Sequence, residues 1–321
     1  MKARSTSCAR IVRSFLPGLV ILSGSAVVCL GAEPPPAPSR AEIEAVLHAA
    51  ARVETGLPKQ LNMVLLADVK DHGPGEHDYP LWQKRWSLLL GGSTRSDEQQ
   101  ANLYGPPIGD PEVSKGAQRV TVTSAWHWPT DEQFESANVI VAFCYLRWTT
   151  ERIERMRSYL HRGGGLVVVH PASWTLPEGT AEVAELLGIG GYEFYRHGPV
   201  DVQITAPEHP ICLGLPARIR LHDETYWPPD PAMEPGKVTV LAVSQEKVSP
   251  QSEQTAPQPV LWTYPCGKGR VFGCQPGHYH WTFDDPYYRI ILLRGIAWAA
   301  QDSPYRFDEL ALRDARTNDS D

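Results

Sequence analysis

Short apolar runs alternate with amphipathic stretches through the first two thirds of this 321-residue chain. The runs at residues 138–142 and 166–169 consist almost entirely of Val, Ile, Leu and Ala. Such runs are typical of strands that helices cover on both faces, and hence of a parallel sheet. Between them, Ile153, Met156 and Leu160 form an apolar stripe at helical spacing. The pattern predicts strands at residues 62–69, 119–124, 138–145 and 166–170, and helices at about residues 80–90, 150–162 and 180–187.

After residue 198 the strands become shorter and alternate more clearly between apolar and polar positions. They are predicted at residues 200–205, 219–221, 238–243, 260–263 and 270–274, and a last helix at about residues 286–300. We expect these strands to form an antiparallel extension of the same sheet, so the predicted fold class is α/β. Residues 33–39, residues 244–258 and the chain after Arg306 are polar and are expected to lack regular structure.

The first 32 residues have the composition of an export signal. Four basic residues precede an apolar stretch from Phe15 to Leu30, and Gly31 and Ala32 offer small residues for cleavage. The alternative is an uncleaved membrane anchor, although Pro17 interrupts a stretch that is short for a span of about 20 residues. The expected organisation is a signal peptide (1–32), a linker with a short helix (33–60), one domain (61–302) and a C-terminal tail (303–321). We expect the protein to be exported to the periplasm or outside the cell, with no stable membrane span after cleavage.

Charge and cysteine content exclude several classes of function. The formal net charge of the chain is −7, and residues 1–32 carry four basic and no acidic groups, so the chain without them carries −11. Nucleic acid is therefore an unexpected partner, because binding to phosphates needs a concentrated basic face. Cysteines 144, 212, 266 and 274 form no CxxC pair and are predicted to be free buried thiols. No Gly-x-Gly-x-x-Gly motif follows a strand, which argues against hydride transfer.

The loop from His72 to Asp78 reads His-Gly-Pro-Gly-Glu-His-Asp and follows the first predicted strand. It places two imidazoles and two carboxylates at the end of that strand. In open α/β sheets, ligands bind at such strand ends. His72, Glu76 and His77 could hold a divalent metal such as Zn²⁺, hydrogen-bond a polyol, or only stabilise a turn. A metal would need further ligands, for which the candidates are His170, Asp223, Glu224 and His278.

Other candidate residues follow later strands. His170 ends a central strand and could act as a ligand or general base, or could fix its loop through a backbone carbonyl. Asp223 and Glu224 are adjacent, so in an extended chain only one of them faces the crevice as a general acid or base. The other is expected to pair with a cation such as Arg270. His278 is the candidate of a Gly-His-Tyr-His-Trp segment.

Aromatic residues also gather near these candidates. Trp174 and Tyr226 could stack on the apolar faces of sugar rings, or could belong to the core. The polar insertion at residues 93–115 joins a helix to the next strand. Such connections lie at the sheet edge opposite the ligand crevice, so the insertion is expected to be remote from the site.

Seven short motifs occur in an order that resembles the ThuA family of trehalose-utilisation-like proteins. They are the His72–Asp78 run, His209-Pro210-Ile211, Gly214-Leu215, Asp223-Glu224-Thr225-Tyr226, Pro259-Val260-Leu261-Trp262, Gly267-Lys268-Gly269-Arg270-Val271-Phe272 and Gly277-His278. The resemblance implies a flavodoxin-like, doubly wound and mainly parallel sheet, as in class I glutamine amidotransferases. It also implies work on trehalose-like disaccharides or their keto derivatives.

The candidate catalytic residues are His170, Asp223 and Glu224, and the candidates for substrate binding are His72, Glu76, His77, Trp174, Tyr226 and His278; the resemblance is what implies that Asp223, Glu224 and His278 lie at the same site as the others. A glutaminase would need a cysteine nucleophile after the strand at 166–169, where His170-Pro171-Ala172 stands instead, and Cys144 lies on the preceding strand. We therefore expect no glutaminase activity. The expected function is isomerisation or cleavage of a small carbohydrate by acid/base chemistry; the alternative is a non-catalytic module that binds carbohydrate or protein. The sequence leaves the oligomeric state open.

Overall fold

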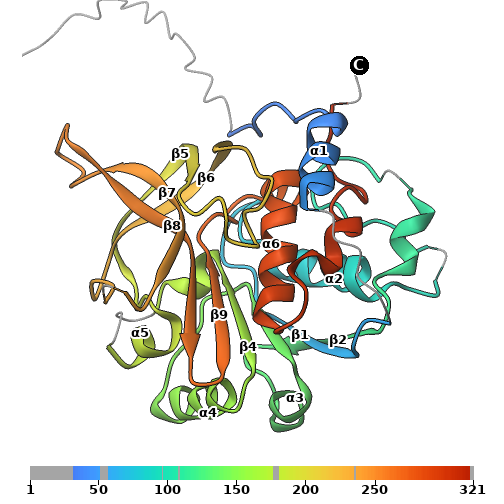
Figure 1. Cartoon of the computed structure of the whole chain (residues 1–321), viewed down its shortest axis with the longest axis horizontal. Coiled ribbons are helices and arrows are strands. Elements are labelled where there is room, and N and C mark those ends of the chain that lie inside the picture. Colours follow the sequence, from blue (N-terminus) through green and yellow to red (C-terminus); the bar gives the residue numbers. More distant parts are fainter. Residues whose placement is uncertain are drawn as a thin grey trace, which may run out of the picture. The chain divides into compact units, whose positions relative to one another are not determined.

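The computed structural model of the protein describes residues 32–50, 57–95, 97–107, 109–175, 181–234 and 236–318. The predicted export signal lies outside the described residues except for Ala32. The described chain forms a nine-stranded mixed sheet with strand order β2-β1-β3-β4-β9-β8-β7-β5-β6, flanked by helices (Figure 1). The predicted α/β class is thus confirmed, with a parallel part that comes largely from the first half of the chain and an antiparallel part that follows it.

The parallel part of the sheet consists of five strands: β1 (Leu61–Ala67), β2 (Val120–Trp126), β3 (Val139–Ala142), β4 (Gly165–Val169) and β9 (Gly269–Cys274). The first four lie close to their predicted positions. The sequence predicts residues 270–274 in the antiparallel extension, and β9 does pair antiparallel with β8. The expectation is wrong for its other neighbour, because β9 pairs in parallel with β4. The segment after β9 therefore leaves the sheet at the same edge as the loops after β1 and β4.

The antiparallel part consists of β5 (Tyr192–Ile204), β6 (Arg218–Pro229), β7 (Thr239–Lys247) and β8 (Thr255–Cys266). These strands are longer than predicted, since strands with one face near solvent carry many polar residues. Residues 244–258 are no irregular linker: β7 and β8 pair up to Lys247 and Thr255. In the pairing of β5 with β6, His197 stands opposite Glu224.

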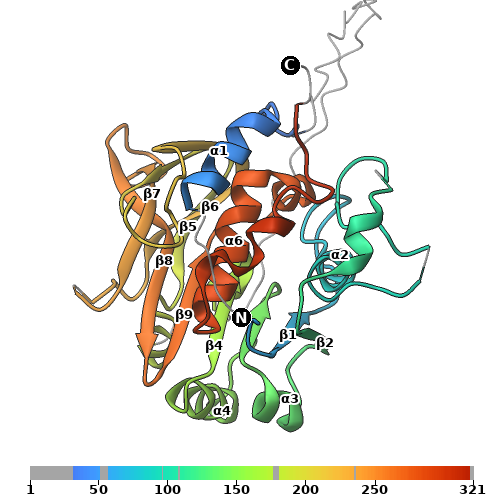
Figure 2. The same cartoon turned by 45° about the vertical axis from the view of Figure 1, so that its right-hand side comes forward.

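Helices cover both faces of the sheet. They are α1 (Arg40–Ala50), α2 (Tyr79–Gly91), α3 (Asp131–Ser136), α4 (Thr150–His161), α5 (Ala181–Leu187) and α6 (Pro286–Ala299). Phe272 of β9 faces α6, where a Cβ on Gly295 would come within 2.1 Å of its ring. The neighbouring Gly273 points to the other face, against Trp262, whose indole donates to Leu187 O of α5. Figure 2 shows α6 lying along β4 and β9.

Two segments expected to be irregular or remote are packed onto the domain. The 3₁₀ helix η4 (Pro304–Leu310) follows α6, and Phe307 is buried. The insertion at residues 93–115 contains the 3₁₀ helix η1 (Pro111–Lys115), but its middle returns to the carboxyl edge of the sheet. There the carboxylate of Asp284 accepts N–H groups from Leu103 and Tyr104, and the ring of Tyr104 lies 5.0 Å from that of His280. The insertion is therefore nearer the strand ends than its sequence suggests.

The four cysteines of the described chain are free and buried, as predicted. None of the helices in the described part combines the length and apolar character that crossing a bilayer requires.

Candidate functional site

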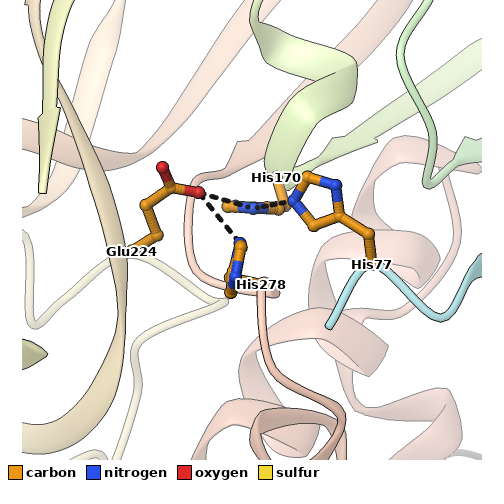
Figure 3. A group of neighbouring side chains, drawn as sticks. All are labelled: His77, His170, Glu224 and His278. Carbon is orange, nitrogen blue, oxygen red and sulfur yellow. Dashed lines mark hydrogen bonds and ion pairs between the residues drawn. The ribbon is translucent and has the colours of Figure 1, made fainter. Parts of the chain in front are cut away.

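Three histidines that follow parallel strands and one glutamate from within an antiparallel strand meet at the carboxyl edge of the parallel sheet (Figure 3). His77 lies in the loop after β1, His170 begins the 3₁₀ helix η2 (His170–Ser173) directly after β4, and His278 follows β9. Glu224 comes from β6. All four are buried, and one potential ligand atom from each lies within 4.8 Å of the others. We call these four residues the His/Glu cluster.

The backbone brings the two loops of the cluster into direct contact. The N–H of His77 donates to His278 O at 2.9 Å. His77 and His170 both have a positive φ, 42° and 53°, which is costly for residues other than glycine and is kept where the surrounding structure enforces it. Gly277 has φ 144°, and a Cβ there would meet the Cβ of His170 at 3.1 Å. Glycine at 277 thus allows the loop carrying His278 to approach His170.

His77 and His170 are each held by their Nδ1 atoms. Nδ1 of His77 lies 2.8 Å from Asp71 Oδ1, and Nδ1 of His170 lies 2.7 Å from Gln275 O. Since an ionised carboxylate and a carbonyl oxygen only accept, both Nδ1 atoms carry a proton. In the neutral rings, both Nε2 atoms then carry lone pairs, and they face each other at 2.9 Å. Two lone pairs so close repel unless a proton or a cation lies between them.

A proton on His77 is unfavourable, because burial lowers its pKa to about 3. His278 shows the opposite tendency: burial opposes its charged form, but the carboxylates of Glu224, Asp223 and Glu76 raise its pKa above the usual value. The cluster therefore attracts positive charge while disfavouring its placement on His77. A bound cation satisfies both conditions, as does a proton held between the two Nε2 atoms on the side of Glu224.

Glu224 contacts two of the three histidines of the cluster (Figure 3). Its Oε2 lies 3.2 Å from His170 Nε2 and 3.0 Å from His278 Nδ1, and it accepts the hydroxyl of Tyr226 at 3.1 Å. Burial raises the pKa of the Glu224 carboxyl, but contacts with the two imidazoles outweigh burial and hold it well below its usual value. Neither ring nitrogen of His278 makes a directed hydrogen bond, although the side chain is 1% exposed.

The donor set fits a divalent transition metal. Three imidazole nitrogens and one carboxylate oxygen suit Zn²⁺. Ligating histidines usually donate their other N–H to a carboxylate or a backbone carbonyl, as His77 does to Asp71 and His170 to Gln275. Buried His278 makes no directed hydrogen bond, so one of its ring nitrogens is also open to a cation. A second group that could hold a metal, Asp71, His72 and His77, shares His77 with the cluster and is more exposed.

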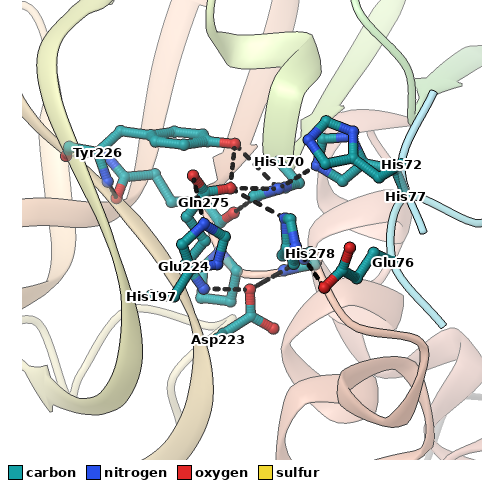
Figure 4. Close-up of polar contacts among 12 residues, drawn as sticks. His72, Glu76, His77, His170, His197, Asp223, Glu224, Tyr226, Gln275 and His278 are labelled. Atoms are coloured by element: carbon teal, nitrogen blue, oxygen red, sulfur yellow. Dashed lines mark hydrogen bonds and ion pairs between the residues drawn. The ribbon is translucent and has the colours of Figure 1, made fainter. Parts of the chain in front are cut away.

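Most of the residues singled out from the sequence surround this cluster (Figure 4). The ring of His72 lies 3.8 Å from that of His77, and Glu76 Oε1 lies 3.8 Å from His278 Nε2. The hydroxyl of Tyr226 lies 2.9 Å from His170 Nε2. The ring of Trp174 lies 4.7 Å from that of Tyr226, one residue further from the cluster.

Asp223 occupies a different place from the one expected for a catalytic acid. Its Oδ1 accepts the backbone N–H groups of Gly277 and His278, both at 2.9 Å, and the hydroxyl of Thr282 donates to its Oδ2. Asp223 is therefore occupied in fixing the loop that carries His278. The expected partner of the outward acid, Arg270, instead donates to Trp298 O.

Three residues at the site were missed from the sequence. Asp71 immediately precedes His72 and could have been included in the loop motif. His197 stands opposite Glu224 in the β5–β6 pairing, and its Nε2 lies 3.6 Å from Glu224 Oε1. Its side chain is 42% exposed, so it lies at the mouth of the site. Gln275 contributes a backbone carbonyl, which no side-chain motif reveals.

Cys144 is not placed as a nucleophile. It is buried, and burial raises the pKa of its thiol well above the usual range, which disfavours the reactive thiolate. The expectation of no glutaminase activity stays a prediction.

Comparison with known proteins identifies the family. Residues 82–299 match the ThuA family, described as trehalose utilisation, and the chain belongs to that family. Among solved structures, the chain is similar to a putative ThuA-like protein from Bacteroides uniformis, with 18% identity, coverage of 79% of this chain and 98% of the other, and a TM-score of 0.54. A putative ThuA-like protein from Parabacteroides merdae gives 19% identity, coverage of 75% and 90%, and a TM-score of 0.51. No curated protein matches the sequence.

Proposed function

We propose that the protein is a metal-dependent enzyme that acts on a small carbohydrate, with the divalent cation held by His77, His170, Glu224 and His278. The observation that carries this proposal is the pair of Nε2 atoms of His77 and His170, which face each other at 2.9 Å with both Nδ1 atoms committed to acceptors.

A divalent cation held by these four residues would act as a Lewis acid by taking a carbonyl or hydroxyl oxygen of the substrate as an additional ligand. The protein supplies the groups that move protons beside it. His197 is accessible from solvent, and partial burial lowers its pKa below the usual 6.5, so a neutral imidazole is available to accept a proton. Tyr226 bridges His170 and Glu224 and would orient a substrate oxygen through its hydroxyl. Isomerisation or cleavage by proton abstraction next to a carbonyl fits these groups.

Aromatic side chains support a carbohydrate as the substrate. Trp174 packs against Tyr226, Tyr192 and Tyr195, and Tyr195 is 59% exposed beside His197. The exposed ring of Tyr195 would stack on the apolar face of a sugar, while the buried rings of Tyr192 and Tyr226 support Trp174 from behind. The family description, trehalose utilisation, supports trehalose-like disaccharides or their keto derivatives.

The proposal includes two further expectations. Residues 1–32 would direct export, so that the enzyme acts in the periplasm or outside the cell. The strand order β2-β1-β3-β4-β9 supports a flavodoxin-like, doubly wound parallel half, in which ligands bind at the carboxyl ends of the strands.

The test is incubation of the purified mature protein with disaccharides and 3-keto-disaccharides, with zinc or with EDTA, followed by mass spectrometry. We expect a product that EDTA abolishes and that added metal restores. His170→Ala should abolish turnover, whereas His48→Ala, on the exposed side of α1, should leave it unchanged.

Two outcomes contradict the proposal. Turnover that is unaffected by EDTA would exclude the metal. A sugar that binds, as shown by calorimetry, but is recovered unchanged with every metal tested would support the binding module instead.

A further inference from the structure

A cavity of about 650 Å³ opens beside the His/Glu cluster, within the range of about 300 to 1,000 Å³ that small-molecule sites occupy. It lies among the ends of three neighbouring parallel strands, since its lining includes Asp68 after β1, His127 after β2 and Tyr145 after β3. In the strand order, the chain continues from β1 to β2 in one direction and from β3 to β4 in the other. Ligands of open α/β sheets bind at such a switch point between neighbouring strands.

Two arginines on this cavity have no acidic partner within the described residues. Arg147 is exposed, and no ion pair forms at its guanidinium in the described chain. Arg152 donates to Arg147 O at 2.8 Å and lies over the ring of Trp128 at 4.7 Å, also without a carboxylate. Further along α4, by contrast, Arg155 pairs with Asp131, and Arg157 pairs with Glu154. Among the arginines at positions 147, 152, 155 and 157, the two without an ion pair in the described chain are thus the two that line the cavity.

The acids on the cavity wall are already committed elsewhere. Asp68 Oδ1 lies 2.7 Å from His127 Nδ1 and accepts the N–H of Val69. Asp71 accepts from His77 and from the hydroxyl of Tyr79. Neither carboxylate pairs with Arg147 or Arg152. The two guanidiniums are therefore free to bind an external oxyanion, which arginine holds through paired hydrogen bonds.

The cavity also adjoins the proposed reaction centre. Asp71 and Tyr79 line it and contact His77 directly. Tyr145 lines it as well, with its ring 5.8 Å from that of His77. A molecule that fills the cavity therefore ends against residues that touch the cluster.

We propose that this cavity binds an oxyanion group, a carboxylate or a phosphate, on the substrate through Arg147 and Arg152, while the sugar portion reaches the His/Glu cluster. The inference rests on the proposed function and narrows its substrate class to an acidic derivative of such a sugar, a uronate or a sugar phosphate, in preference to the neutral sugar.

The test measures calorimetric binding of four probes to the zinc-loaded protein: glucuronate, glucose 6-phosphate, neutral glucose and inorganic phosphate. Glucuronate or glucose 6-phosphate should bind at least about tenfold more tightly than glucose, because a guanidinium–oxyanion hydrogen bond is charge-assisted. Tighter binding of glucuronate identifies a carboxylate, and tighter binding of glucose 6-phosphate identifies a phosphate. Inorganic phosphate that binds as tightly as the sugar phosphate would overturn the part of the proposal that concerns a sugar.

Variants separate the cavity from general charge effects. Arg147→Gln should remove the preference for the acidic sugar, and Arg147→Lys should retain part of it, which also shows that the position tolerates change. Arg155→Gln removes one arginine from α4 outside the cavity and should have no effect. Equal affinities for acidic and neutral sugars, or equal losses in Arg147→Gln and Arg155→Gln, would overturn the inference.

The result is distinguishable from failure of the proposed function. If the protein binds acidic sugars through Arg147 but binds no metal, the anion site stands and the metal-dependent function falls. If zinc-dependent turnover of a neutral disaccharide is unaffected by Arg147→Gln, the function stands and the anion site falls.

Discussion

Asp71→Asn isolates the contribution of the residue that orients His77. In the structure Asp71 Oδ1 lies 2.8 Å from His77 Nδ1, and the hydroxyl of Tyr79 lies 3.1 Å from each carboxylate oxygen. The carboxylate fixes the tautomer that directs Nε2 of His77 into the cluster, and contact with the imidazole lowers the pKa of Asp71 to about 2 despite partial burial. Asparagine keeps the shape but loses the charge and one acceptor oxygen.

Loss of such a carboxylate usually weakens metal binding about 10- to 100-fold, or about 1.4 to 2.7 kcal/mol. Because the side chain of Asp71 is 36% exposed and water can take over part of its role, we expect a loss near the lower limit, about tenfold. The assay is zinc titration in competition with a chromophoric chelator, for folded protein at pH 7.5. Asp68→Asn is the matched control, since Asp68 lies in the same loop but pairs with His127. Equal zinc affinity of the two variants would refute the role of Asp71.

Three further predictions concern stability. In the metal-free protein, burial lowers the pKa of His77 from 6.5 to about 3, so the unfolded chain binds more protons than the folded protein between these pH values. The free energy of unfolding should therefore fall as the pH drops from 7 to 5, and it should fall less steeply in His77→Gln. Equal pH dependence of the two proteins in denaturant titrations would argue against the burial of His77. Gly273→Ala places a Cβ 2.1 Å from the ring of Trp262 and should cost at least about 1 to 3 kcal/mol in urea unfolding; an unchanged midpoint would contradict that packing. Asp284→Ala leaves Arg289 buried without its acid and should cost about 3 to 5 kcal/mol by the same measurement, and a loss below about 1 kcal/mol would show that the pair is dispensable.

Much of the parallel half of the sheet could be predicted because its strands are continuous apolar runs separated by helical patterns. The position of β9 could not. Its local pattern is that of a short strand, and nothing within residues 269–274 shows that β4, more than a hundred residues earlier, is its neighbour. The same long-range pairing places His278 beside His170. With β9 assigned to the antiparallel extension, the sequence could not predict on which edge of the sheet His278 lies.

The types of residue at the site were easier to predict than their roles. Alternation along β6 showed that Asp223 and Glu224 face opposite ways, but which one meets the histidines depends on the path of the loop after β9. That loop presents its N–H groups to Asp223, and Glu224 is left to the imidazoles. His197 and the carbonyl of Gln275 reach the cluster only through strand pairing, so no local sequence motif predicts their place at the site.

The most direct test of the account is an anomalous difference map, recorded at the zinc absorption edge, from crystals of the zinc-loaded protein. We predict one strong peak at about 2.0 to 2.2 Å from the Nε2 atoms of His77 and His170, a ring nitrogen of His278 and a carboxylate oxygen of Glu224. A map without a peak among these four residues, or with zinc held only by Asp71 and His72, would contradict the central claim that the buried His/Glu cluster is a metal centre.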